Sequence, residues 1–178
     1  MVRCSPSTDK PPAEAGSSPP DLHVCPFTVA YDTREQAPWT FGNVVLGGKL
    51  WVVRRQLTTM ATGDYAIADM DRVCIERKSA SDFYGSVVGG APRFKREHER
   101  MAEMVAGGCF ACVVVEGSLS DVCMERPGKA NGVLGACAAW PARYGVHWFF
   151  AGDRRTAEIL AFRIMLKQWE EGGCSDSK

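Results

Sequence analysis

Short apolar runs and alternating apolar and polar residues recur along the chain and predict six β-strands. These strands cover residues 27–31, 50–57, 65–68, 72–77, 110–116 and 146–150. Alternation with a period of two, as in residues 50–57, is typical of a strand with one buried face. The uninterrupted apolar run at residues 110–116 indicates a central strand that is covered on both faces. The turn Asp69-Met70-Asp71 lies between two of the segments and predicts a hairpin.

Helical patterns separate the later strands. The predicted helices cover residues 81–88, 93–106 and 131–140 and a last segment that starts at Asp153. Pro92 suits the first turn of a helix, and Asp153 suits the N-cap position. The last helix carries an apolar stripe: Ala157, Leu160, Ala161, Ile164, Met165 and Trp169. A hairpin region followed by a β-α-β-α order predicts an α/β fold of three layers, in which helices flank a central mixed β-sheet.

The two ends of the chain lack the large apolar residues that a core requires. Residues 1–24 are rich in Pro, Ser, Ala and charged residues, and residues 172–178 are similar. Such segments bury too little surface to offset the entropy of ordering, so both are predicted to be disordered tails. One domain is therefore expected at residues 25–171.

Composition limits the classes of partner and the compartment. The 21 Lys and Arg residues balance the 21 Asp and Glu residues, so binding to a polyanion requires a local basic patch. We find no apolar run of about 18 residues for a membrane helix and no signal peptide, so we expect a soluble, intracellular, cytoplasmic protein. The eight cysteines are then expected to be free thiols. Cys109 and Cys112 form a lone CxxC that leads into an apolar run, which favours buried small residues over a zinc or redox site.

Acidic residues gather at the ends of predicted strands. Asp32 closes the first strand, Asp64 opens the hairpin, and Glu76 lies on the second hairpin strand. Glu76 and Lys78 are two residues apart, so their side chains point to the same face of the sheet. If the three carboxylates converged, each pair about 4 Å apart would repel by about 4 kcal/mol at an effective dielectric constant near 20. Mg²⁺ or Mn²⁺ would offset this repulsion, and a lysine beside the ion could orient a water molecule toward a phosphate. Taken singly, the same residues would indicate only a charged strand edge and a turn.

The spacing of these residues resembles the signature of the XPF-family nuclease domain. Gly63-Asp64 is followed by eleven residues, Glu76-Arg77-Lys78, three residues and Asp82. Asp32-Thr33-Arg34-Glu35 resembles the Asp-x-Arg-Glu element of the family, and residues 113–117 resemble its later apolar strand ending in Glu-Gly. The similarity spans about residues 27–170. The family belongs to the PD-(D/E)XK nucleases, so the resemblance implies a restriction-endonuclease-like fold and an XPF-type nuclease domain at residues 25–171.

The resemblance also implies a catalytic centre. Asp64, Glu76 and Asp32 would bind Mg²⁺ or Mn²⁺, and the carbonyl of Arg77 could complete the coordination. Lys78 would position the attacking water.

Further residues take their expected roles from the same motifs. Arg34 and the Arg77 side chain would hold phosphate or brace the carboxylates, and Arg93 is a candidate for contact with DNA phosphate. Glu35 could form a salt bridge to Arg34 or Arg77, or take part in catalysis. Asp82 could be a helix N-cap or a partner of Arg77, and the structural role is favoured.

The segment after the signature departs from the family pattern. Relatives often have a Gly-Arg pair followed one turn later by Gln, whereas this chain has Ala91-Pro92-Arg93 and Glu97. Acidic and basic residues alternate over residues 93–103, which is typical of a solvated, ion-paired helix face. The tandem helix-hairpin-helix module of eukaryotic and archaeal relatives has no room in the sequence, which resembles stand-alone domains of bacteria and phages.

The leading hypothesis is a Mg²⁺- or Mn²⁺-dependent endodeoxyribonuclease that hydrolyses phosphodiesters in branched or single-strand/double-strand junction DNA, as in repair or recombination. A non-catalytic DNA-binding or dimerisation partner is one alternative, and a Holliday-junction or restriction-type nuclease of the same fold is another. By analogy with the family we expect a homodimer, formed through the last two helices with Trp140, Ile164 and Trp169 facing the partner. A separate protein could target the enzyme to DNA. The expected location is the cytoplasm of a bacterial or phage-infected cell.

Overall fold

The structure, a computed structural model, describes residues 21–173. Its strands are β1 (Asp21–Asp32), β2 (Val44–Leu46), β3 (Lys49–Thr58), β4 (Tyr65–Ile67), β5 (Met70–Ser79), β6 (Phe110–Glu116) and β7 (His147–Phe150). Its helices are α1 (Ala80–Val88), α2 (Pro92–Ala106), α3 (Leu119–Met124), the 3-10 helix η1 (Pro127–Lys129), α4 (Ala130–Tyr144) and α5 (Arg154–Gly173).

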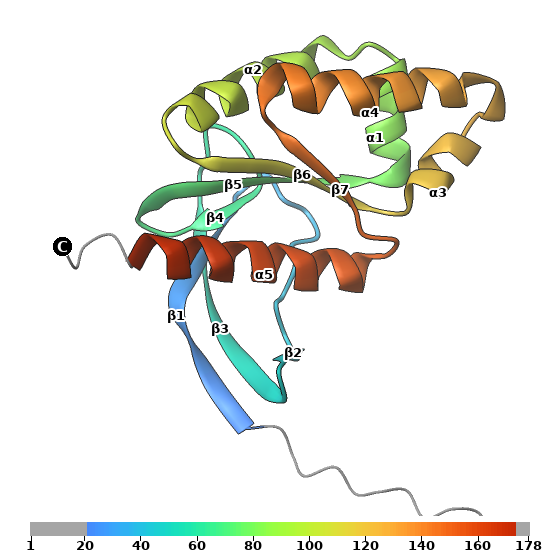
Figure 1. The fold of residues 1–178 in the computed structure, drawn as a ribbon. Helices are drawn as coiled ribbons and strands as arrows, with labels where there is room; N and C mark the ends of the chain where they lie inside the picture. Colours follow the sequence, from blue (N-terminus) through green and yellow to red (C-terminus); the bar gives the residue numbers. More distant parts are fainter. Residues whose placement is uncertain (1–20, 174–178) are drawn as a thin grey trace, which may run out of the picture.

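The strands form one mixed sheet in the order β2-β3-β1-β4-β5-β6-β7. β1 pairs in parallel with β3, β4 pairs antiparallel with both β1 and β5, and β2 pairs antiparallel with β3. β5, β6 and β7 are parallel to one another. The hairpin β4–β5 therefore joins the part of the sheet formed by β1, β2 and β3 to the part formed by the parallel strands β5, β6 and β7, as Figure 1 shows.

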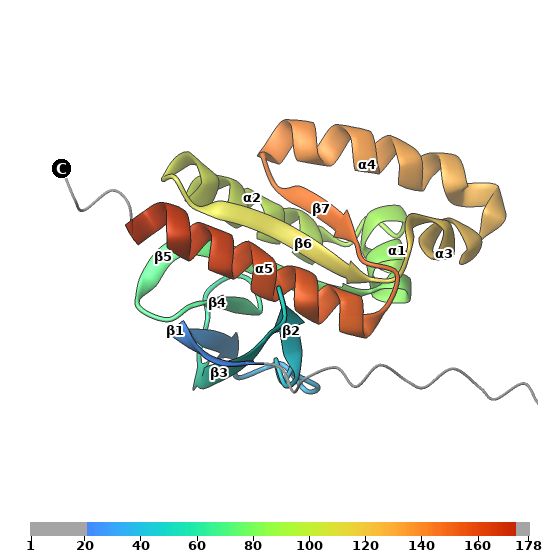
Figure 2. The same cartoon turned by 60° about the horizontal axis from the view of Figure 1, so that its bottom comes forward.

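Helices cover both faces of the sheet. In Figures 1 and 2, α5 lies on one face, whereas α1, α2 and α4 lie on the other. One core packs between α5 and the sheet and includes Phe27, Tyr65 and Phe162. The other packs under α1, α2 and α4 and includes Phe83, Phe94 and Val133. The three-layer α/β arrangement expected from the sequence is confirmed.

The apolar stripe of α5 faces the sheet as its spacing predicts. Asp153 caps the helix, because the backbone N–H of Thr156 donates to its Oδ1 at 2.8 Å. Ala157, Ala161 and Met165 are fully buried. This face fixes α5 across β5 and β6 and leaves the opposite side of these strands to α2.

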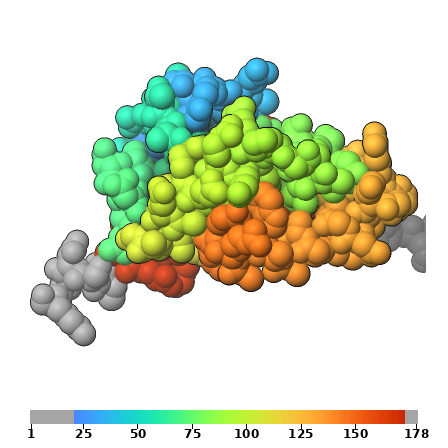
Figure 3. Space-filling model, turned by 90° about the horizontal axis from the view of Figure 1, so that it is seen from above, coloured from blue at the N-terminus to red at the C-terminus, as the bar shows by residue number. Residues whose placement is uncertain are grey.

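His98 holds α2 against the sheet. It is fully buried, and the indole N–H of Trp148 in β7 donates to its Nε2 at 2.9 Å. Nδ1 then carries the ring proton and donates to the Phe94 carbonyl at 3.0 Å. Figure 3 shows α2 (yellow-green) beside α4 (orange) on this face of the molecule. The inner face of α2 is therefore fixed in rotation, which matters for the site below.

The start of the domain differs from the sequence prediction. β1 begins at Asp21, inside the segment 1–24 that was predicted to be a disordered tail. Residues 21–24 pair with β3 from Asp21↔Lys49 to Val24↔Val52. Leu22 and Val24 are 67% and 65% exposed, so hydrogen bonding and not burial orders this stretch, and the apolar pattern gave no sign of it. The remaining tail predictions, for residues 1–20 and 174–178, lie outside the described residues.

Other boundaries differ too. The short elements β2, α3 and η1 were not predicted, since three to six residues carry too little periodicity. α4 continues past its predicted end at residue 140 to Tyr144, with Pro141 inside the helix. α5 reaches Gly173, beyond the predicted domain end at residue 171.

The side chains predicted to face a dimer partner are partly buried within their own chain and partly exposed. Trp140 packs against the core under α1, α2 and α4, whereas Ile164 and Trp169 pack against the core under α5. These side chains contact their own chain because both helices need their apolar faces to cover the sheet.

The six described cysteines are free thiols, and Cys109 and Cys112 are buried, as expected. Among the described helices, none combines the length and apolar character that a membrane crossing requires.

Phe162 of α5 is fully buried between Phe27, Phe41 and Trp51. We predict that Phe162→Ala lowers the free energy of unfolding by about 3 to 5 kcal/mol, because it leaves a cavity in the core. Thermal unfolding followed by circular dichroism measures this. Leu134→Ala is the control, since Leu134 is 46% exposed on α4 and its loss should change stability by less than about 0.5 kcal/mol. Equal effects of the two variants would contradict the packing described here.

Candidate active site

Gly63 and Asp64 form a tight turn against β5. Gly63 has a φ of +75°, and a Cβ at this position would lie 2.6 Å from the Cys74 Sγ and 3.2 Å from the Ile75 carbonyl oxygen. Only glycine fits both restrictions. The backbone N–H of Asp64 donates to the Ile75 carbonyl at 2.8 Å, and the N–H of Arg77 donates to the Asp64 Oδ2 at 2.8 Å. The Gly-Asp pair therefore holds a carboxylate beside β5.

Glu76 and Lys78 project from β5 toward α2. Cys74, two residues earlier, belongs to the core under α2, so the alternation of the strand sends Glu76 and Lys78 to that face. Glu76 is 4% exposed, and the Lys78 Nζ donates to its Oε1 at 2.5 Å. The same Nζ lies 5.4 Å from the centroid of the Phe94 ring. The structure thus brings the amine and the carboxylate together on one face.

Burial disfavours the charged forms of Asp64, Glu76 and Lys78. Burial, followed by the charge of Asp64, raises the pKa of Glu76 well above its usual value. Burial also raises the pKa of Asp64 to about 6, although its hydrogen bond from Arg77 acts in the opposite direction. Burial acts to lower the pKa of Lys78, but the charge and hydrogen bond of Glu76, together with the charges of Glu97 and Asp64, outweigh it and the pKa is raised overall. Two carboxylates thus lie near one amine, which is bonded to Glu76 and acts on Asp64 through its charge, and a cation would stabilise this arrangement.

Asp32 has a different set of partners. Its Oδ1 accepts from the backbone N–H and the Nε of Arg34, both at 2.7 Å. Its Oδ2 accepts from the Arg34 Nη2 at 3.0 Å and from the backbone N–H of Met60 at 2.8 Å. The hydrogen bond from Arg34 lowers the pKa of Asp32 to about 2. The backbone N–H of Asp32 donates to the Asp64 carbonyl at 2.9 Å and so joins Asp32 to the hairpin. The Asp32 carboxylate, by contrast, binds Arg34 and the loop after β3.

Arg77 points to the opposite face of β5, where it joins two acids. Its Nη1 donates to Glu35 at 2.8 Å, and its Nε and Nη2 donate to Glu116 at 2.8 and 2.9 Å. Glu116 also accepts from the indole N–H of Trp39 at 2.7 Å and from Arg154 at 3.1 Å. Of the two roles open to its side chain, Arg77 braces carboxylates. Glu35 forms the salt bridge to Arg77 that was one of its alternatives, with 10% of its side chain exposed.

Glu116 is a site-supporting residue to which the sequence analysis assigned no role. Its only sequence signal was its place at the end of an apolar run. In the sheet it pairs with Ser79, so the parallel register of β5 and β6 carries it to the level of the signature.

Asp82 has neither of the structural roles considered for it. The Ser79 Oγ accepts from the backbone N–H of Asp82 at 3.1 Å, so Ser79 is the N-cap of α1. Asp82 is exposed in the first turn, and Arg77 binds other acids. The prediction failed because Ser and Asp are both common caps and lie three residues apart.

Two of the arginines predicted to contact phosphate, Arg34 and Arg93, reach solvent. Arg34 has 62% of its side chain exposed, and its Nη2 also donates to the Met60 carbonyl at 2.8 Å. Arg93 is exposed in the first turn of α2, next to Phe94. Both could meet a phosphate without breaking the core.

α2 adds an acid that was expected to be solvated. Lys95 and Glu99 do form an exposed pair at 3.6 Å, as the alternating charges predicted. Glu97, by contrast, is only 8% exposed, and its charge acts on Asp64, Glu76 and Lys78.

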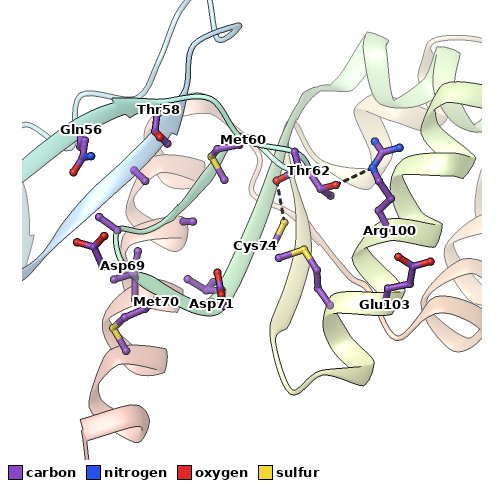
Figure 4. A pocket seen from close by; sticks show the side chains of 17 residues that line it. Gln56, Thr58, Met60, Thr62, Asp69, Met70, Asp71, Cys74, Arg100 and Glu103 are labelled. Carbon is purple, nitrogen blue, oxygen red and sulfur yellow. Dashed lines mark hydrogen bonds between the residues drawn. The ribbon is translucent and has the colours of Figure 1, made fainter.

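A pocket of about 940 Å³ adjoins the Gly-Asp turn. Residues 60–62, the β4–β5 turn and α2 line it, and Arg100 donates to the Thr62 hydroxyl at 2.8 Å across its rim (Figure 4). Within residues 21–173, no three His, Cys, Asp or Glu side chains gather closely enough to hold a metal ion as they stand. The carboxylates of Asp64 and Glu76, which are close enough for the charge of one to act on the other, nevertheless offer the hard oxygen atoms that Mg²⁺ and Mn²⁺ prefer, so the donor set fits such an ion.

A mixed sheet covered on both faces, with an Asp at a hairpin and Glu-x-Lys on the next strand, defines the class of restriction-endonuclease-like folds. The ERCC4 domain matches residues 32–162, and the chain belongs to this family. This confirms the predicted resemblance to the XPF nuclease domain.

Two solved structures of XPF from Aeropyrum pernix are similar in fold. The one in complex with DNA has 24% identity and a TM-score of 0.62 over 82% of this chain, and the other has 24% identity and a TM-score of 0.59 over 79%. The matches take in 66% and 60% of those chains, so this chain spans less than two thirds of their length. Comparison with curated proteins gives no match.

We predict that the metal-free protein loses stability as the pH rises from about 4 to about 6. Asp64 binds its proton more tightly in the folded state, with a pKa of about 6, than in the unfolded chain. The free energy of unfolding therefore falls as this proton is lost. The melting temperature should fall by roughly 5 °C over this range. Asp64→Asn should reduce the fall, and a melting temperature that rises equally with pH in both proteins would contradict the burial described here.

Proposed function

We propose that the chain is a Mg²⁺- or Mn²⁺-dependent endonuclease that hydrolyses phosphodiester bonds in DNA. The observation that carries the proposal is the placement of half-buried Asp64 and buried Glu76 near Lys78 at one face of β5. A salt bridge needs one acid for one amine, whereas this site has two acids for one amine. The pKa of each acid is raised, so their ionised forms are disfavoured. Such an arrangement is typical of a functional site.

Asp64 and Glu76 would hold the ion, with the Arg77 carbonyl as a third ligand. The N–H of Arg77 is directed at the Asp64 carboxylate. Because the N–H and C=O groups of one strand residue point to the same side, the Arg77 carbonyl faces Asp64 as well. A divalent ion, when bound, would lower the pKa of a water molecule and offset the negative charge of the attacked phosphate.

Lys78 would orient the attacking water. Its amine is anchored by Glu76 and lies over the Phe94 ring, while 20% of its side chain remains exposed. An amine held in this way keeps N–H donors for a water molecule or a phosphate oxygen. Arg34 and Arg93 are the exposed cations for the DNA backbone, and Asp32 sets the position of Arg34. In this proposal Asp32 supports the site in place of binding the ion directly.

Branched or junction DNA is the proposed substrate, on the strength of membership in the ERCC4 family and the likeness to an XPF structure in complex with DNA. A homodimer through the last two helices remains our expectation, since Trp140, Ile164 and Trp169 pack only partly within the chain and keep some exposed surface. Gel filtration with light scattering measures its mass. A protein of monomer mass at micromolar concentration would contradict the dimer.

We predict that Glu76→Gln and Lys78→Ala each lower DNA cleavage by at least about 100-fold in Mg²⁺ or Mn²⁺. Labelled fork, flap and plain duplex DNA, separated on denaturing gels, measure the rate and the preferred structure. Lys95→Ala is the matched control, since Lys95 has 59% of its side chain exposed on α2 and should leave the rate unchanged. Cleavage without a divalent ion, or equal rates in all variants, would reject the proposed function.

A further inference from the structure

Glu97 lies on the inner face of α2. The buried residues of this helix are Phe94, Glu97, His98 and Met101, whose spacing of three and four marks the side that packs on the sheet. His98 fixes this face through Trp148. An acidic residue with 8% exposure is thus built into a side of the helix that is otherwise aromatic and apolar.

Its neighbours on the helix show where Glu97 points. Phe94, three residues earlier, lies under the Lys78 amine, with 5.4 Å between Nζ and the ring centroid. Arg100, three residues later, donates to the Thr62 hydroxyl at 2.8 Å, just before the Gly-Asp turn (Figure 4). Residues three apart share one helix face. Glu97 therefore faces the gap between Lys78 and Thr62, where the carboxylates of Asp64 and Glu76 are held.

The charge of Glu97 affects the pKa of both acids and of the amine in the site. It raises the pKa of Asp64 and of Glu76, and it favours the charged form of Lys78. Within residues 21–173, the Glu97 carboxylate has no hydrogen-bond or ion-pair partner. Its oxygen atoms are not among the fully buried polar atoms without a partner, so they reach water at the edge of the site and are available to a water molecule.

We propose that Glu97 is the third acidic residue of the divalent-ion site, in the place that the resemblance assigned to Asp32. This inference rests on the proposed function. Asp32 already satisfies both of its oxygen atoms with Arg34 and Met60, whereas the Glu97 carboxylate makes no such bonds within residues 21–173. As they stand, the three acids are not close enough to bind one ion directly. Glu97 therefore acts through its charge and a bridging water, as outer ligands of metal sites do.

The test is a calorimetric titration of the full chain with Mn²⁺, for the unchanged protein, Glu97→Gln and Glu103→Gln. Glu103 is an exposed acid on the same helix, so its variant loses the same charge outside the site. We expect Glu97→Gln to raise the dissociation constant for Mn²⁺ by about 10- to 100-fold, and Glu103→Gln to leave it within about twofold. Cleavage by Glu97→Gln should recover as the Mn²⁺ concentration is raised.

Melting temperatures without metal separate this role from a structural one. If Glu97 belongs to the ion site, Glu97→Gln should melt near the temperature of the unchanged protein in the absence of metal. Addition of Mn²⁺ should then raise the melting temperature of the variant by less than that of the unchanged protein. A lower metal-free melting temperature with unchanged Mn²⁺ affinity overturns the inference. If Glu76→Gln abolishes binding while Glu97→Gln binds normally, the inference fails and the proposed function stands. If the unchanged protein binds no Mn²⁺, the proposed function fails as well.

Discussion

The site depends on two carboxylates and one amine that share a volume from which water is largely excluded. Asp64 and Glu76 both resist ionisation there, and the single positive charge of Lys78 offsets only one of them. The fold keeps the acids together through backbone bonds that do not depend on their charge. Asp64 is held by the N–H groups of Asp32 and Arg77 and by the carbonyl of Ile75. Repulsion between the acids therefore cannot simply push Asp64 into solvent. This constraint leaves the addition of a cation as the simplest way to stabilise the ionised site.

The alternation of β5 separates two tasks. Glu76 and Lys78 turn toward α2 and form the proposed reactive face, whereas Arg77 turns toward α5 and joins Glu35 to Glu116. Arg77 is thus a positioning residue that connects β5, β6 and the segment after β1. Its backbone N–H meets Asp64 while its side chain fixes the strand from behind. Arg77 therefore connects the proposed reactive face to the opposite side of the sheet.

Much of this could be predicted from sequence because it follows from local periodicity. The common face of Glu76 and Lys78 follows from their spacing of two, and the N-cap at Asp153 follows from helix chemistry. Asp32 was harder, because its role depends on the N–H of Met60, which is remote in sequence. Glu97 was misjudged because alternating charges around it suggested a solvated face, and only the packing of Phe94 and His98 shows that it is buried. Long-range partners and the rotation of a helix are tertiary properties, and a local pattern does not determine them.

Crystals soaked in Mn²⁺ and measured at the manganese absorption edge test the central claim most directly. We predict an anomalous peak within direct bonding distance of the carboxylates of Asp64 and Glu76, with Glu97 facing it across a water molecule. A peak at another place, or an ordered site in which Asp64 and Glu76 turn away from each other in the presence of Mn²⁺, would contradict it.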